Sequence, residues 1–148
     1  MRPTKGCFWL GPLFIAGCST APGTVQTSSP PPVEDVASAT TIWDGVYTTA
    51  QADRGRTVAQ ASCFGCHSQN EWATPMFLRV WSGRPVGDLY ENLRMTMPYD
   101  APGRLSREEY SELVSYMLRL NNAPAGDADL PSDAAGLSSI LMAPRADQ

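Results

Sequence analysis

The sequence predicts an all-α fold for one small domain, and three observations support this prediction. The chain has 148 residues, a length that suits a single domain. Apolar residues recur at the helical spacing i, i+3, i+4 and i+7 in two stretches, residues 86–93 and 113–120. No run of useful length alternates apolar and polar residues with the period of two that is typical of a strand. We therefore expect helices packed around one core, without a sheet.

The first expected helices have clear start signals. Thr48 or Thr49 can cap a helix that continues to about Ser62, since a threonine oxygen accepts a hydrogen bond from a backbone N–H of the first turn. Thr74 followed by Pro75 begins a short helix as its cap and first position. Both helices precede the two periodic stretches in the chain.

The periodic stretches are bounded in the same way. The first follows Pro85 and ends before Pro98, because proline cannot continue a helix. Ser106 and Glu109 form a capping box that begins the last long helix. The pair of asparagines that starts at Asn121 ends it.

Residues 1–17 have the pattern of a lipoprotein signal peptide. Arg2 and Lys5 precede an apolar run that is too short to span a bilayer. The run ends in Ile15-Ala16-Gly17-Cys18, which resembles the bacterial lipobox, in which the cysteine is acylated and becomes the new N-terminus. A plain signal peptide with a chance cysteine and an uncleaved anchor are the alternatives.

Residues 18–42 are expected to form a lipidated N-terminus and a flexible tether. They consist mainly of Ser, Thr, Ala, Pro and Val, and such a composition cannot build a core. The mean span of this segment is roughly 27 Å for a flexible coil. We expect a lipid-anchored, periplasm-facing protein of a bacterial cell envelope. Ser19, which follows the cysteine, favours the outer membrane by analogy with Gram-negative sorting.

The folded unit is expected at residues 43–122, followed by a C-terminal extension at 123–148. In the extension, Ser132 can cap a short helix that packs on the domain or contacts a partner, and its apolar face would hold Leu137, Ile140 and Leu141. The formal net charge of the chain is −4. Since a nucleic-acid partner requires a concentrated basic surface, we expect none.

The strongest motif is Cys63-Phe64-Gly65-Cys66-His67, which has the C-x-x-C-H spacing of covalent c-type haem attachment. Two residues between the cysteines hold both sulfurs beside one porphyrin edge, and the next residue brings its imidazole to the iron. His67 is the only histidine in the chain. The motif predicts one haem c, bound through Cys63 and Cys66 and ligated by His67.

Three other interpretations of this motif are weaker. A zinc site would need a second cluster of Cys or His to complete its tetrahedron. A thioredoxin-like C-x-x-C would need a βαβ setting. A disulfide between Cys63 and Cys66 is possible, but it would leave a small helical core without the staple that such domains commonly need.

Methionine is the natural second axial ligand, because no other histidine remains. Met95 and Met97 both lie where the helix before Pro98 breaks, and both are candidates. We favour Met97, because Pro98 stiffens the loop that would present its sulfur. The remaining methionines of the mature chain lie too near His67, on a buried helical stripe, or in the tail: Met76, Met117 and Met142.

These residues together resemble class I cytochromes c. The likeness covers roughly residues 43–122 and rests on the C-x-x-C-H motif, Thr96-Met97-Pro98, Gly55 and the helix with Leu113 and Tyr116. Residues 77–84 look especially like small bacterial cytochromes c linked to quinoprotein alcohol dehydrogenases. The resemblance implies a small helical domain wrapped around one covalent haem.

The resemblance also implies roles for single residues. Gly55 would let the first and last helices cross closely against Tyr116. The carbonyl of Pro75 would accept a hydrogen bond from the ring N–H of His67 that faces away from the iron. The haem propionates would be contacted by Trp81 and Arg84.

The expected function follows from the ligation. A haem iron with two protein ligands has no open site for a substrate, so we expect an electron-transfer protein and not an enzyme. Its partners would be redox proteins, such as a quinoprotein dehydrogenase or a terminal oxidase. The alternatives are a haem enzyme or gas sensor with a labile sixth ligand, and a haem subunit within a dehydrogenase or oxidase complex.

Overall fold

The computed structural model describes residues 40–144 of the chain. The chain divides into two units between Glu34 and Asp35, and every described residue lies in the second unit. The predicted signal peptide, Cys18 and residues 19–39 of the predicted tether lie outside the described residues.

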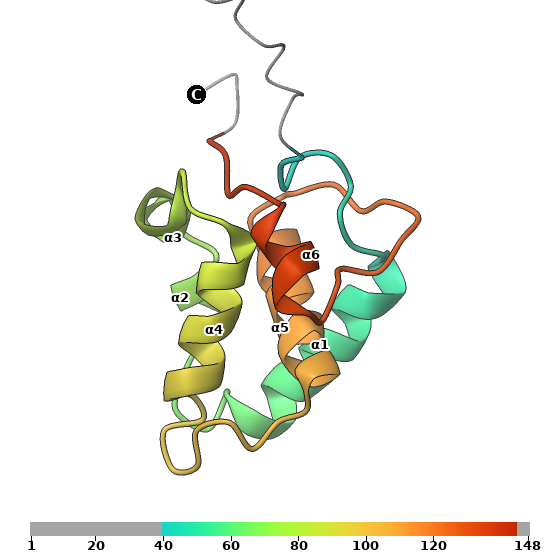
Figure 1. The fold of residues 1–148 in the computed structure, drawn as a ribbon. Helices are drawn as coiled ribbons and strands as arrows, with labels where there is room; N and C mark the ends of the chain where they lie inside the picture. Colours follow the sequence, from blue (N-terminus) through green and yellow to red (C-terminus); the bar gives the residue numbers. More distant parts are fainter. Residues whose placement is uncertain (1–39, 145–148) are drawn as a thin grey trace, which may run out of the picture. The chain divides into compact units, whose positions relative to one another are not determined.

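The all-α prediction is confirmed for residues 40–144, which form six helices and no β-strand. None of these helices is long and apolar enough to cross a membrane. In chain order the helices are α1 (Thr49–Ser62), α2 (Gln69–Trp72), α3 (Pro75–Trp81), α4 (Val86–Thr96), α5 (Arg107–Leu120) and α6 (Ala134–Ser138). Helix α1 crosses α5, and α4 packs on both α5 and α6 (Figure 1).

Local capping chemistry begins most of these helices where the sequence predicts. The hydroxyl of Thr48 accepts a hydrogen bond from Gln51 N at 3.0 Å and begins α1. Thr74 caps α3, and the Ser106 capping box begins α5. Helix α4 ends at Thr96, just before the Met97-Pro98 step.

Two helices differ from the expectation. Helix α2 was not predicted, and a capping box between Ser68 and Glu71 begins it. The predicted cap of α6 is wrong, because Asp133 rather than Ser132 accepts the hydrogen bond from Gly136 N, at 2.9 Å. The helix ends at Ser138, so Ile140 and Leu141 follow it.

The crossing of α1 and α5 depends on Gly55. A Cβ atom at this position would lie 1.8 Å from the carbonyl oxygen of Glu112 and 3.0 Å from Leu113 N. Only glycine permits this approach of the two backbones. The implied close crossing is therefore confirmed, although Gly55 faces the backbone of Glu112 and Leu113 rather than Tyr116.

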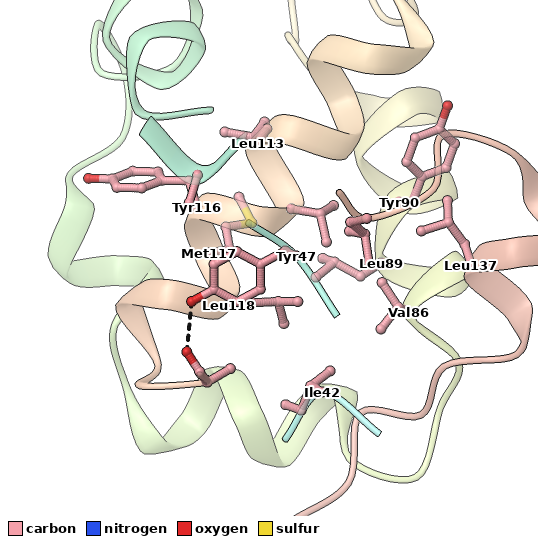
Figure 2. Packing of buried hydrophobic residues seen from close by; sticks show 14 of the residues in the cluster. Ile42, Tyr47, Val86, Leu89, Tyr90, Leu113, Tyr116, Met117, Leu118 and Leu137 are labelled. Carbon is pink, nitrogen blue, oxygen red and sulfur yellow. Dashed lines mark hydrogen bonds between the residues drawn. The ribbon is translucent and has the colours of Figure 1, made fainter. Parts of the chain in front are cut away.

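The buried core extends beyond residues 43–122. Ile42 is fully buried, and so is Leu137 of α6, which packs in the same cluster as Val86 (Figure 2). The hydroxyl of Tyr47 donates a hydrogen bond to Ala123 O at 2.7 Å, which is drawn as a dashed line in Figure 2. Further buried residues of the C-terminal segment are Leu130, Ile140 and Met142.

The C-terminal segment also joins two distant parts of the backbone. Leu141 N donates to Thr40 O at 2.8 Å, and Ile42 N donates to Leu141 O at 3.0 Å. The next residue, Met142, donates its N–H to Arg84 O at 2.9 Å. Two alternatives were predicted for the C-terminal extension, packing on the domain or contact with a partner. In this structure it packs on the domain.

Candidate haem site

The predicted site residues meet at one cavity of about 800 Å³, a volume typical of cofactor pockets. Five of the seven residues predicted to bind the haem line this cavity: Cys63, Cys66, His67, Trp81 and Met97. Pro75 and Arg84 are not in its wall. Most of the remaining wall is apolar, and its apolar residues from α3, α4 and α5 are Phe77, Leu89, Leu93, Leu113 and Met117.

The end of α1 positions both cysteines. Cys63 is the C-cap of this helix, and Cys66 N and His67 N both donate to Cys63 O, at 3.0 and 2.9 Å. This turn brings the two sulfurs and the imidazole to the same cavity. Both cysteines are free thiols, Cys63 half-buried and Cys66 exposed. Burial raises the pKa of the Cys63 thiol, and the charge of Arg104 lowers it by a smaller amount.

The imidazole of His67 is held from the side by a carboxylate. Nδ1 of His67 lies 3.0 Å from Oε2 of Glu71. The hydrogen bond with His67, followed by those with Ser68, lowers the pKa of the Glu71 carboxyl. Because an ionised carboxylate only accepts hydrogen bonds, Nδ1 carries the proton, and Nε2 is left as the nitrogen that can ligate a metal.

Glu71 therefore occupies the position that the resemblance implies for Pro75. Pro75 is the first residue of α3, and the Nδ1 partner of His67 in this structure is Glu71. Sequence reasoning missed Glu71. The signal that could have found it is the S-x-x-E spacing of Ser68 and Glu71, which directly follows the haem motif.

The two candidate methionines differ in placement. Met97 is the C-cap of α4, has extended backbone (φ −129°, ψ 151°), and lines the cavity. The hydroxyl of Tyr110 donates to Met97 O at 2.6 Å and accepts from Gly103 N at 3.1 Å, so the loop is tied to α5. Met95 is 65% exposed and does not line the cavity.

The two residues predicted to meet the propionates form a stacked pair. The guanidinium of Arg84 lies 4.7 Å from the centre of the Trp81 ring, and its Nε donates to Asp88 at 2.9 Å. Arg84 thus stacks on a residue of the cavity wall but does not itself line the cavity. Another arginine, Arg104, does line the cavity, and no motif in the sequence indicates it.

The donor set fits a haem. Residues 40–144 contain no group of three or more His, Cys, Asp or Glu side chains that could hold a metal ion by themselves. The cavity instead combines one imidazole, the thioethers of Met97 and Met117 and two free thiols with a mostly apolar wall. This combination suits a porphyrin that brings four of the iron ligands itself.

Comparison with known families agrees with this site. Residues 50–117 match the family model of cytochrome c oxidase, cbb3-type, subunit III. The match supports a class I c-type cytochrome, a class that binds haem and transfers electrons, and it implies covalently bound haem c. Searches among curated proteins and among solved structures gave no match.

Proposed function

We propose that this protein is a membrane-tethered c-type cytochrome that carries single electrons between redox partners, with His67 and Met97 as its axial ligands. The observation that carries the proposal is the meeting of Cys63, Cys66, His67 and Met97 at one cavity. When bound, haem supplies a reversible one-electron couple.

The side chains of the cavity each have a part in this function. The thiols of Cys63 and Cys66 would hold the haem through thioether bonds. Nε2 of His67 and the sulfur of Met97 would hold the haem iron, and two protein ligands would leave no open site for a substrate. A thioether ligand favours Fe(II) and raises the reduction potential relative to a second imidazole. The apolar wall would keep water from the iron.

The test of this proposal is covalent haem content. The chain is expressed in a bacterial host that has a cytochrome c maturation system, and denaturing gels are stained for haem peroxidase activity. We expect the wild-type band to stain and the double variant Cys63→Ala with Cys66→Ala to lose the stain. Wild-type protein purified from this host without bound haem would overturn the proposal. A five-coordinate wild-type iron that binds carbon monoxide would favour the haem enzyme or gas sensor.

The location that we propose is the periplasmic side of a bacterial membrane, with the outer membrane favoured. The support is the sequence Ile15-Ala16-Gly17-Cys18 behind a short charged and apolar leader, with Ser19 after the cysteine. Acylation at Cys18 with more than one chain would give stable anchoring.

The partners that we propose are a terminal oxidase and a quinoprotein dehydrogenase. The first is supported by the matched family, whose description names an oxidase subunit. The second is supported by the resemblance of residues 77–84. Affinity purification of the protein from detergent-solubilised membranes, followed by haem staining and mass spectrometry, distinguishes them. Stable co-purification with one complex would favour the role of a haem subunit over that of a mobile carrier.

A further inference from the structure

Helix α2 directly follows the haem motif, and hydrogen bonds from buried side chains hold both of its ends. The hydroxyl of Tyr116 donates to Gln69 Oε1 at 2.7 Å, and Nδ2 of Asn121 donates to Trp72 O at 2.7 Å. Tyr116 and Asn121 are both buried. The first and last residues of α2 are therefore both bound to the region of α5, which holds the helix in place.

Glu71, inside this helix, uses its two carboxylate oxygens for different partners. Oε1 accepts from Ser68 N at 2.9 Å and from the Ser68 hydroxyl at 3.1 Å, which fixes the side chain as part of the capping box. Oε2 lies 3.0 Å from Nδ1 of His67. The capping box thus aims one oxygen of the carboxylate at the imidazole.

We propose that Glu71 is a positioning residue for His67, which orients the imidazole and makes it a more basic ligand, so that the reduction potential of the bound haem is lowered. This inference rests on the proposed function. A partner of the outer ring nitrogen fixes the tautomer of a ligating histidine and raises its basicity, and an anion does so more strongly than a neutral acceptor. A more basic imidazole stabilises Fe(III) relative to Fe(II).

Such a partner would moderate the effect of the thioether. Met97 raises the potential, whereas the Glu71 carboxylate lowers it through His67. Two residues would therefore set the reduction potential of the haem: Met97 as a ligand of the iron, and Glu71 through the other ligand, His67. The ring of Trp72, whose centre lies 6.0 Å from that of His67, also packs beside the imidazole.

The decisive variant is Glu71→Gln. Glutamine can keep the capping box at this helix position, so the variant removes the anion and leaves α2 intact. We expect the reduction potential to rise, with about a tenfold change in the equilibrium constant for electron exchange with a reference dye, which is about 59 mV for a one-electron couple. In the Met97→Ala background, the ferrous iron–histidine vibration measured by resonance Raman spectroscopy should fall.

The chain offers two matched controls. Glu109→Gln makes the same change in the capping box of α5, where the carboxylate accepts from Ser106 N at 2.7 Å, and it should leave the potential unchanged. Asp100→Asn removes a carboxylate in the cavity wall and measures the effect of charge alone. An unchanged iron–histidine vibration in Glu71→Gln, or a shift in potential no larger than that of Asp100→Asn, would overturn the inference. Failure of the proposed function looks different, because the wild-type protein would then lack covalent, six-coordinate haem.

Discussion

Gln51 and Leu130 lie 79 residues apart and hold each other through two hydrogen bonds: Leu130 N donates to Gln51 Oε1 at 2.7 Å, and Gln51 Nε2 donates to Leu130 O at 2.9 Å. Gln51 is only 3% exposed, and its Oε1 also accepts from the hydroxyl of Ser115 at 2.9 Å. One buried amide thus joins α1, α5 and the C-terminal segment.

The first prediction concerns this amide. Gln51→Ala removes the acceptor for Leu130 N, while Leu130 O keeps the bond from the hydroxyl of Ser111 at 2.8 Å. A buried N–H left without a partner costs about 1–3 kcal/mol. We expect the free energy of unfolding, measured by denaturant titration of the haem-loaded protein, to fall by this amount. Gln60→Ala, on the exposed side of the same helix, should change it little.

The second prediction concerns the helix crossing. Gly55→Ala places a methyl group on the carbonyl of Glu112, and neither backbone can move aside without separating α1 from α5. Overpacking of this kind costs about 1–3 kcal/mol or more. We expect a lower thermal midpoint and less haem-loaded protein, with Gln60→Ala again as the control. A Gly55→Ala protein as stable as the wild type would show that the two helices pack less closely than described.

Helix starts were predictable because each depends on a local bond. Thr48, Thr74 and Ser106 each accept from a backbone N–H three residues ahead, so a short stretch of sequence contains the whole signal. Helix α2 was missed because four residues contain no apolar period. At the start of α6, Ser132 and Asp133 are both residue types that commonly cap helices, so the local sequence does not distinguish them. In the structure the side chain of Asp133 accepts the hydrogen bond from Gly136 N.

The residues that the C-terminal segment contacts could not be predicted, because its hydrogen bonds join residues that lie far apart in the sequence. Nothing local in residues 123–144 indicates that Leu141 bonds Thr40, or that Leu130 bonds Gln51. The site divides in the same way. The C-x-x-C-H motif has fixed spacing, so its three residues were found together, whereas the placement of Pro75 and Arg84 outside the cavity wall depends on distances that a resemblance does not contain.

The third prediction tests this segment. Leu137 of α6 is fully buried among Val86, Leu89 and Tyr90 (Figure 2). Leu137→Ala should lower the free energy of unfolding by about 2–5 kcal/mol, the cost of the lost burial and of the cavity left behind. Asp127→Asn, at an exposed position of the same segment, is the control. Equal stability of the two variants would mean that residues 123–144 do not contribute to the core in solution.

The fourth prediction concerns the lipid anchor. In a bacterial host, the mature protein should begin at Cys18 and have the mass of an acylated cysteine, and it should stay with membranes in fractionation without detergent. Cys18→Ala should block acylation and processing, because no sulfur remains to receive the lipid. Cys7→Ala, which changes the cysteine within the predicted signal peptide, should leave acylation and processing unchanged. An unmodified Cys18 in mature wild-type protein would contradict the anchor.

The last prediction is that Met97, and not Met95, ligates the iron. Met95 is still within α4, and its side chain is 65% exposed. Met97 directly follows α4 and has extended rather than helical backbone. It lines the same cavity as His67. The bond from Tyr110 to Met97 O holds the loop in this position, so little loop entropy is lost when the weak sulfur–iron bond forms.

Spectra of the two alanine variants test this assignment. Oxidised wild-type protein should show the weak far-red band of a sulfur–iron bond. Met97→Ala should lose this band, bind carbon monoxide and have a lower reduction potential, because a soft ligand that favours Fe(II) is gone. Met95→Ala should keep the band and exclude carbon monoxide. The opposite pattern would assign the ligand role to Met95. Tyr110→Phe adds a finer measure, since it removes the two hydrogen bonds of the hydroxyl, with Met97 O and with Gly103 N, and keeps the methionine. It should weaken the sulfur ligand without replacing it, seen as partial carbon monoxide binding.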